Sequence, residues 1–380
     1  MGRPMNMRTR TSGGPSVWRP ELRQRVIVGM SGGVDSSVAA ALLAAAGYDV
    51  VGIFMRLWGS GPESGCCSLD DCFDARRVAA RLRIPFCVTD VQERFGCAVV
   101  EPFVSEYLQG RTPNPCVHCN RSVKFYGLWE QARALGAQWI ATGHYARVRR
   151  DPETGRAQLW SAAAAAKDQS YFLFALEPEV LQRMLLPLGE MTKAEVRARA
   201  QALELPVAEK PESQEVCFAP SGEYAAFVAQ RAAPPAAPIS GVIVDAGGHV
   251  LARHGGVHQF TIGQRRGLGV STGTPLYVTA IDAQNGTVRV GPRAATVSAG
   301  LVARGANWLD GHPVQDGARL DVKIRSRFTP VPATVREATP DGFELYADDG
   351  LPAVTPGQAA VLYRGGQVIG GGWIERPLPA

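Results

Sequence analysis

Near its start the chain reads Arg25-Val-Ile-Val-Gly-Met-Ser-Gly-Gly-Val-Asp-Ser-Ser-Val38, and this stretch decides the fold. Its apolar residues 26–30 predict a short buried strand. Two adjacent glycines then force a tight turn, and residues 38–46 predict a helix capped by the Asp-Ser-Ser side chains of 35–37. Backbone N–H groups and the positive end of the helix dipole would point at a phosphate there. We therefore predict an anion-binding loop, with an ordinary strand–turn–helix corner as the alternative.

The glycine loop differs from the two commonest phosphate loops. No Gly-Lys-Ser/Thr follows it, which excludes a Walker A site, and its glycines are not spaced as G-x-G-x-x-G. Its Ser-Gly-Gly-Val-Asp-Ser pattern resembles the pyrophosphate loop of ATP pyrophosphatases. That resemblance implies cleavage of ATP to AMP and pyrophosphate, usually to adenylate an oxygen. Synthetases for GMP, NAD, argininosuccinate and lysidine share this loop with RNA thiolases, so the substrate stays open.

Length and composition indicate a multidomain globular protein. A chain of 380 residues is too long for one ordinary core, so we expect two or three domains. Hydrophobic residues make up 46%, and no apolar run is long enough to span a membrane. The first twenty residues lack the apolar core of a signal peptide. We expect a cytoplasmic protein with a disordered tail over residues 1–22.

The charged residues and the cysteines indicate the kind of partner and the compartment of the protein. The formal net charge is +5, and only 5 of the 40 basic residues are lysine. Arginine suits phosphate and base contacts, which is a weak indication of RNA, although genome composition alone would also produce it. The eight cysteines are clustered rather than spread as a disulfide framework. A reducing compartment, with cysteines used in catalysis or metal binding, is the better interpretation.

Strands and helices alternate along the first part of the chain. Residues 48–54 and 85–89 read as buried strands, and 70–82 between them as an amphipathic helix. This alternation predicts an α/β domain with a doubly wound, mostly parallel sheet. Met55 ends the second strand near the carboxyl edge, where nucleotides bind in open α/β folds. It would cover an adenine there, or simply fill the core.

Residues 110–125 carry a second informative stretch, Gly-Arg-Thr-Pro-Asn-Pro-Cys-Val-His-Cys-Asn-Arg-Ser-Val-Lys-Phe. The prolines on both sides of Asn114 predict a stiff segment that is not helical. Cys116 and Cys119 form a C-x-x-C pair, with basic residues near enough to lower a thiol pKa. A redox pair, part of an iron–sulfur site and a sulfur-handling nucleophile are all compatible with this spacing.

The remaining cysteines have different settings. Cys217 lies in an extended, Pro-flanked segment and offers a third thiol that could meet Cys119 in space. Cys66, Cys67 and Cys72 have no histidine or fourth cysteine nearby to complete a metal site. We expect these three to have no catalytic role.

Two further stretches supply polar candidates. Residues 139–145 predict a strand that runs into a loop, where Gly143 would let a nucleotide approach. His144 would touch a phosphate or a base there, or serve as a structural histidine. Residues 167–172, Lys-Asp-Gln-Ser-Tyr-Phe, read as polar residues before a helix start, for which a plain helix cap is the alternative.

Beyond residue 222 the composition changes to short β-type runs punctuated by Gly, Asp and Asn. Residues 233–238 read as a linker. A basic glycine loop over 260–269 suits a nucleic-acid backbone, and 325–328 sets cations beside an aromatic ring, with solvated surface charge as the alternative for both. The expected division is a nucleotide-binding domain over 23–220, a central domain over 221–292 and a β-barrel over 293–380.

Together these segments resemble the bacterial and organellar tRNA-specific 2-thiouridylases, the MnmA/TrmU family, from Arg25 to Ile374. The resemblance rests on ordered motifs at 29–37, 110–125, 141–147, 167–173, 210–218, 254–268 and 357–373. It implies ATP- and Mg²⁺-dependent 2-thiolation of the wobble uridine in tRNAs for Lys, Glu and Gln, through adenylation of the uridine O2 and transfer of sulfur from a protein persulfide. Another pyrophosphate-loop ligase or amidotransferase, or a non-enzymatic RNA-binding protein, would leave these motifs unexplained.

The resemblance also implies roles for single residues. It implies that ATP binds to Gly29, Met30, Ser31, Gly32, Gly33, Val34, Asp35, Ser36, Met55 and Gly143. Cys217 would carry the persulfide sulfur, and Cys119 would be the nucleophile that releases it, through a transient disulfide between the two. Contacts with tRNA or the target base are implied for Asn114, Pro115, Cys116, His144, Lys167, Asp168, Gln169, Arg325, Ser326 and Gln358.

Cys116 departs from the family pattern, because many relatives have Asp there for acid–base chemistry or base contact. With Cys119 and Cys217 it makes a three-thiol set, which resembles variants that hold a [4Fe–4S] cluster with one iron open to sulfide. We favour persulfide chemistry and keep the cluster as the alternative. The expected partners are tRNA, through its anticodon arm, and a persulfide carrier or cysteine desulfurase, and we expect a monomer.

Overall fold

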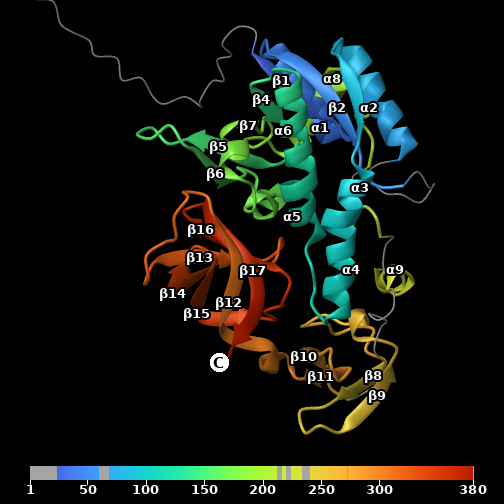
Figure 1. The fold of residues 1–380 in the computed structure, drawn as a ribbon, viewed down its shortest axis with the longest axis vertical. Coiled ribbons are helices and arrows are strands. Elements are labelled where there is room, and N and C mark those ends of the chain that lie inside the picture. Colours follow the sequence, from blue (N-terminus) through green and yellow to red (C-terminus); the bar gives the residue numbers. More distant parts are fainter. Residues whose placement is uncertain are drawn as a thin grey trace, which may run out of the picture.

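The computed structural model of the protein describes residues 24–59, 68–211, 216–219, 224–232, 240–271 and 273–379. The expected tail over 1–22, Cys66, Cys67 and the expected linker over 233–238 lie outside these residues. Figure 1 shows an α/β domain at one end of the long axis, a small β-sheet at the other, and a β-barrel beside them. None of the described helices is both long and apolar enough to cross a membrane.

A five-stranded sheet forms the centre of the α/β domain, in the order β3-β2-β1-β4-β7. Its strands are β1 (Arg25–Gly29), β2 (Asp49–Arg56), β3 (Phe86–Asp90), β4 (Trp139–Ala141) and β7 (Met184–Leu185). All four pairings are parallel, which confirms the predicted doubly wound sheet. The strand order reverses at β1, so the glycine loop that follows β1 opens into the crevice where ligands bind in such folds.

Helices cover both faces of this sheet. One face is covered by α1 (Val34–Ala45), α2 (Leu69–Leu82) and α8 (Lys193–Ala202). The other face is covered by α6 (Phe125–Ala134) and α7 (Pro178–Gln182). Strand β1 is buried on both sides, because Val26 and Val28 point to the first group and Ile27 to the second. Continuous apolar character is what a parallel strand covered on both faces requires.

Helix α1 begins at Val34, earlier than predicted, and its N-cap is Gly33. The prediction that side chains of 35–37 cap this helix is wrong, because they lie inside its first turn. The Ser37 hydroxyl donates to the Gly33 carbonyl at 2.8 Å, and the Ser36 hydroxyl accepts from the Ser31 N–H at 3.1 Å. Among the described residues, no side-chain cap is made to the first N–H groups of α1, and such a helix start suits an anion.

The cysteine-rich segment is helical, contrary to prediction. Helix α5 (Pro115–Cys119) continues through a π-helical turn over 120–124 into α6. Asn114 is its N-cap and accepts from the Val117 N–H at 3.4 Å. Pro115 occupies the first helical position, where a missing N–H costs nothing, so the prolines start a helix here instead of preventing one. Cys116 and Cys119 therefore lie about one turn apart on a helix that enters the α/β domain.

Smaller helical elements complete this domain. They are α3 (Gln92–Phe95), a π-helical turn over 96–100 and α4 (Glu101–Leu108), then short 3₁₀ turns over Ala165–Lys167 and Ser170–Leu173. The 3₁₀ turns replace the helix start predicted at 167–172. Residues 206–209 form a turn where we predicted an extended segment. Helix α9 (Tyr224–Arg231) leads into the central domain.

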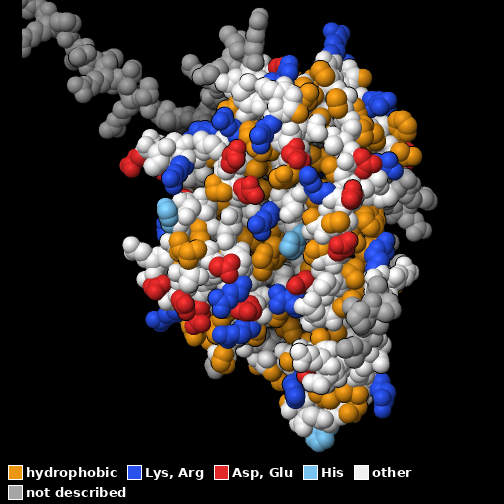
Figure 2. Space-filling view, viewed as in Figure 1, with side chains coloured by type: hydrophobic (Ala, Val, Ile, Leu, Met, Phe, Trp, Pro, Cys, Tyr) orange, Lys and Arg blue, Asp and Glu red, His pale blue; other side chains and the backbone are white. Residues whose placement is uncertain are grey.

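The rest of the chain forms two β structures. The central sheet has the order β10-β11-β8-β9 and consists of β8 (Gly241–Val244), β9 (Val250–His254), β10 (Tyr277–Asp282) and β11 (Thr287–Gly291). The last domain consists of β12 (Val297–Trp308), β13 (Arg319–Lys323), β14 (Val331–Thr339), β15 (Gly342–Pro352), β16 (Ala359–Arg364) and β17 (Gln367–Leu378). Pairing of β12 with β17 closes these six antiparallel strands, which confirms the predicted barrel. On the face drawn in Figure 2, acidic and basic side chains are interspersed over the barrel.

The barrel is fastened to the α/β domain by a shared sheet and by a buried ion pair. The hairpin of β5 (Ala146–Arg150) and β6 (Ala157–Ser161) extends the barrel sheet beside β17, with the Ser161 N–H donating to the Gly366 carbonyl at 2.8 Å. Lys323 of β13 lies 3.5 Å from the carboxylate of Asp168, and both side chains are buried. The barrel and the α/β domain are therefore joined by a common sheet and by a buried side-chain contact.

We expect Gly32→Ala to destabilise the protein by about 1–3 kcal/mol, because it would hold a non-glycine residue in a left-handed conformation against backbone. Gly32 has φ +74°, and an added Cβ would lie 2.2 Å from the Asp71 carbonyl oxygen. Urea denaturation measures the loss. The control is Gly33→Ala, where φ is −96° and the nearest atom is 3.6 Å away, so the expected cost is about 1 kcal/mol or less, from the weaker N-cap. Equal losses in the two variants would contradict this account.

Candidate active site

A cavity of about 370 Å³ lies over the glycine loop, at the carboxyl ends of β1 and β4. A second cavity of about 210 Å³ adjoins it. Five side chains line both cavities: Ser31, Asp35, Lys124, His144 and Gln169. The two cavities form one site, with the uncapped start of α1 in its wall.

Asp35 lies at the centre of the contacts beside the glycine loop. Its Oδ1 accepts from the Tyr145 hydroxyl and from the Lys193 ammonium, both at 2.7 Å. Lys193 is the first residue of α8, so two elements far apart in sequence meet at the glycine loop. An ammonium held beside helix N–H groups provides positive charge for a polyphosphate.

Gly143 is needed for a close approach between two parts of the protein. An added Cβ would lie 2.6 Å from the Asp35 carbonyl carbon and from the Ser36 nitrogen. The loop after β4 therefore lies directly against the first turn of α1. Gly143 also lines the smaller cavity, so the same contact shapes that cavity.

The smaller cavity suits a flat aromatic base. Ile53, Phe54, Met55, Leu57 and Leu128 form an apolar part of its wall, and Thr142 and Ser36 add polar groups to the five side chains shared with the larger cavity. A mostly apolar cleft with a few oriented polar groups is typical of a small-molecule site. Met55 lines this cavity and also packs against the core, and its contact with an adenine stays a prediction.

The larger cavity brings the three predicted sulfur residues together. Cys116 and Cys119 reach it from α5, and Cys217 from the segment before α9. Cys119 is buried, Cys217 half-buried and Cys116 exposed, and none of them forms a disulfide. Apolar side chains from Phe95, Val99, Phe172 and Phe218 line the same space.

The described residues include no group of three or more His, Cys, Asp or Glu side chains arranged to hold a metal ion. Cys116, Cys119 and Cys217 share the cavity without forming such a group.

His144 is neutral at physiological pH. Burial and the nearby charge of Lys124 lower the pKa of His144 to about 3, and its Nδ1 lies 2.7 Å from the Thr142 hydroxyl. A neutral imidazole binds a base or hydroxyl by hydrogen bonding, but it does not offer a phosphate the charge of an imidazolium.

The predicted Lys-Asp-Gln stretch is divided by the fold. Lys167 and Gln169 line the larger cavity, and the Gln169 amide oxygen accepts from the Tyr145 N–H at 2.8 Å. Asp168 instead faces the interior, where it accepts from Ser170 and pairs with Lys323. Its carboxylate joins the barrel to the α/β domain.

The predicted contacts from the barrel lie outside both cavities. The Arg325 guanidinium is half-buried and donates to the Pro352 carbonyl at 3.0 Å, and Ser326 beside it is also half-buried. The Gln358 amide donates to the carbonyls of Thr112 and Pro113 at 3.0 and 3.2 Å. Gln358 thereby holds the strap of chain that enters α5.

A ring stack reinforces this hold on α5. His118, between the two cysteines of α5, lies parallel to Trp373 of β17, with ring centroids 4.3 Å apart. Burial and the charge of Arg121 lower the pKa of His118 to about 4, so the stacked ring is uncharged at neutral pH. The barrel thus fixes both the entry and the middle of the cysteine helix.

Sequence reasoning missed several residues of the larger cavity, namely Asp71, Tyr145, Lys193 and Lys210. The sequence did contain a signal for the two lysines. Only five lysines occur in the chain, and four of them, Lys124, Lys167, Lys193 and Lys210, line this cavity. The fifth is the buried Lys323. Lys323 is buried and the four cavity lysines are half-buried, so none of the five is a fully solvated surface residue.

Comparison with known proteins gives the family. Models described as tRNA methyl transferase HUP domain, tRNA methyl transferase PRC-barrel domain and Aminomethyltransferase beta-barrel domain match residues 24–221, 226–292 and 298–374. A tRNA-specific 2-thiouridylase MnmA of Geotalea uraniireducens is 49% identical over 364 residues, which cover 94% of this chain and 96% of that protein. The chain belongs to the tRNA-specific 2-thiouridylase family. The predicted resemblance is confirmed.

Other relatives agree with this assignment. A tRNA-specific 2-thiouridylase MnmA of Solibacter usitatus is 48% identical, with 93% of this chain and 99% of that protein covered. The solved structure of a 4-thiouridine synthetase–RNA complex with bound ATP aligns at 16% identity and a TM-score of 0.36, over 51% of this chain and 45% of that one. That likeness is too low to add to the assignment to the 2-thiouridylase family.

We expect the protein to lose stability as the pH falls from about 6.5 toward 4, in part through His144. The unfolded state takes up a proton on this residue near its ordinary pKa of 6.5, whereas the folded state resists protonation until about 3. One such site contributes at most about 1.4 kcal/mol per pH unit. Urea unfolding at pH 7 and pH 5 should show a smaller loss for His144→Gln than for the wild type. The exposed His312→Gln serves as the control, and an equal loss in His144→Gln would contradict the prediction.

Proposed function

We propose that this protein is an ATP-dependent tRNA 2-thiouridylase, which replaces O2 of the wobble uridine with sulfur. One observation carries the proposal: an uncapped helix start at a glycine loop shares a cavity with Cys119 and Cys217. A nucleotide site and two thiols in one cavity suit a reaction that activates an oxygen and then displaces it with sulfur. Membership of the 2-thiouridylase family supports the same reaction.

ATP would bind with its adenine in the smaller cavity and its phosphates at the start of α1. Asp35 lines the larger cavity and fits Mg²⁺, which binds mainly through phosphate oxygens and one or two carboxylates. Bound with ATP, Mg²⁺ would neutralise phosphate charge. The uridine O2 attacks the α-phosphorus, and pyrophosphate leaves with its bonding electron pair. Lys193 stabilises the charge that develops on the phosphates.

The sulfur step uses two thiols because sulfur arrives at the oxidation level of a persulfide. A donor persulfide first passes its terminal sulfur to Cys217, and the donor leaves as a thiol. The terminal sulfur of Cys217 attacks C2 of the adenylated uridine, and O2 departs with AMP. The Cys119 thiolate then attacks the Sγ of Cys217 and breaks the S–S bond, which leaves 2-thiouridine and a Cys119–Cys217 disulfide. A dithiol reductant restores both cysteines.

Cys116 lies next to this chemistry, and we propose that it contacts the target base. A [4Fe–4S] cluster on Cys116, Cys119 and Cys217 was the alternative, and no step here is routed through one. The tRNA set, the donor (a persulfide carrier or cysteine desulfurase), the monomeric state, the cytoplasmic location and the domain boundaries remain predictions.

We expect Cys119→Ser and Cys217→Ser to reduce 2-thiouridine formation by more than about 1,000-fold, because each removes a nucleophile. Both should still release pyrophosphate when given ATP and unmodified tRNA, since adenylation needs neither thiol. Nucleoside analysis of the tRNA and a pyrophosphate assay measure the two steps. The exposed Cys97→Ser is the matched control and should keep both activities.

Iron analysis of protein purified without oxygen separates the persulfide route from the cluster route. The persulfide route predicts no stoichiometric iron and turnover with a persulfide donor. Near-stoichiometric iron that is lost together with activity in Cys116→Ser would contradict it. Absence of tRNA-dependent pyrophosphate release from the wild type would contradict the proposed function itself.

A further inference from the structure

Lys210 joins the chain after α8 to helix α2 at the wall of the larger cavity. Its ammonium lies 2.7 Å from Oδ1 of Asp71 and 2.6 Å from Oδ2 of Asp74, both on α2. All three side chains are largely buried. Burial opposes the charge, but the hydrogen bonds to the two carboxylates raise the pKa of Lys210 above its ordinary value. The ammonium therefore stays charged and paired.

The backbone at Lys210 is fixed independently of this ion pair. The Lys210 N–H donates to the Val207 carbonyl at 3.0 Å, and Arg197 of α8 donates to the Lys210 carbonyl at 3.5 Å. Val207 and Leu205 are buried in the core beneath α8. Lys210 is thus held in place by its backbone as well as by its side chain, seven residues before Cys217 in the sequence.

The α2 end of the pair touches the glycine loop. Asp71 belongs to a capping box, in which its Oδ2 accepts from the Ser68 N–H and its own N–H donates to the Ser68 hydroxyl. The backbone of the same residue lies so close to Gly32 that a Cβ there would clash with it. A continuous path of contacts therefore runs from the phosphate loop through the first turn of α2 to Lys210.

The Cys217 end is fixed by aromatic packing. Phe218 lies edge-on to Phe95 and Phe103, with ring centroids 5.5 and 5.0 Å away. Lys210 and Phe218 are therefore each fixed by their own contacts, one on either side of Cys217 in the sequence. Lys210, Asp71 and Cys217 all line the larger cavity.

We propose that Lys210 is a positioning residue that ties the Cys217 segment to the phosphate loop through α2. The inference rests on the proposed function, because it assumes that Cys217 delivers sulfur to a uridine activated at that loop. Lys210 does not take part in adenylation. It keeps the sulfur-bearing segment in register with the activated base, so that sulfur arrives before water hydrolyses the adenylate.

The test separates positioning from ATP binding. In Lys210→Met, we expect 2-thiouridine formed per pyrophosphate released to fall about 10- to 100-fold, because a small misplacement of a reacting group costs that much. Pyrophosphate release should stay within about three-fold of wild type, since Lys193 and α1 are untouched. Lys210→Arg keeps a cation between the two carboxylates and should restore most of the ratio.

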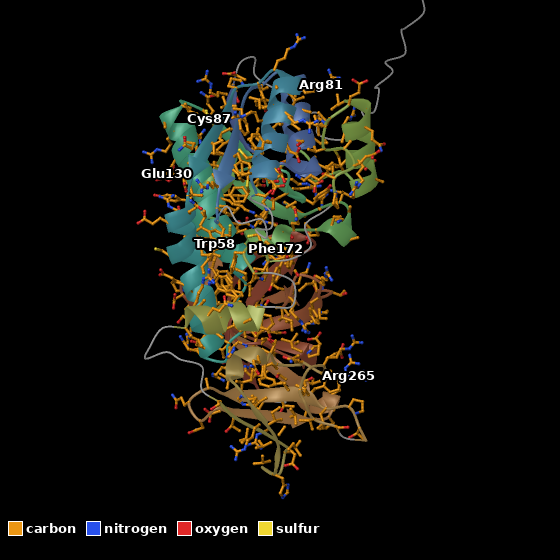
Figure 3. The ribbon with its side chains drawn as sticks, turned by 90° about the vertical axis from the view of Figure 1, so that its right-hand side faces the viewer. Trp58, Arg81, Cys87, Glu130, Phe172 and Arg265 are labelled. Carbon is orange, nitrogen blue, oxygen red and sulfur yellow. The ribbon has the colours of Figure 1, made fainter. Side chains whose placement is uncertain are left out.

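A second ion pair provides the matched control. Arg81 of α2 pairs with Glu204 at 2.5 Å, so it also joins α2 to the chain after α8, but both side chains are exposed. Figure 3 shows Arg81 near the outer end of the α/β domain, well away from Phe172, which lines the cavity. Arg81→Met should keep the wild-type ratio. Lys210→Met combined with Asp74→Asn removes the repulsion left between two carboxylates, in case the single variant folds poorly.

A readout in the free protein keeps the inference separate from the proposed function. Iodoacetamide should alkylate Cys217 about ten-fold faster in Lys210→Met, because the half-buried thiol becomes accessible when its segment is released. Mass spectrometry of the Cys217 peptide measures the rate. An unchanged rate, an unchanged product ratio, or pyrophosphate release that falls as much as thiolation would each overturn the inference.

Discussion

The site depends on close backbone packing around the start of α1. The helix has no side-chain cap, so its first N–H groups can serve an anion only if neighbouring chain segments hold the loop in place. Two glycines make this possible, Gly32 against the backbone of α2 and Gly143 against the backbone of Asp35 and Ser36. Three segments far apart in sequence therefore meet without intervening side chains. The sheet order, helix α2 and the loop after β4 together place these three segments in contact at the start of α1.

The barrel acts on the reaction from a distance. Its contacts reach α5 through the Gln358 amide and the Trp373 ring, and they reach the β5–β6 hairpin through strand pairing. Side chains that read as RNA contacts in the sequence, such as Asp168 and Gln358, are engaged inside the protein. The barrel thus holds the first turn of the helix that carries Cys116 and Cys119, while the continuation of that helix into α6 holds its other end.

Local signals allowed the fold and the family to be predicted. The apolar strand, the paired glycines and the β-α-β alternation each depend on neighbours in sequence, and all were confirmed. Two wrong predictions of local structure came from residue types that occur in two different settings. Pro115 can prevent a helix or start one, and the residues 35–37 can cap a helix or lie within it. The contacts of Lys193, Lys210 and Asp71 depend on segments more than a hundred residues apart, which no local pattern encodes.

The scarcity of lysine has a chemical consequence. The chain has five lysines, four in the wall of one cavity and one buried beneath the barrel, while its solvated positive charge is carried by arginine. Guanidinium groups do not react as primary amines do. Reagents and enzymes that acylate amines therefore meet few side-chain targets on the outer surface. Four of the five lysines line the larger cavity, so acylation of any of these four would change that cavity directly.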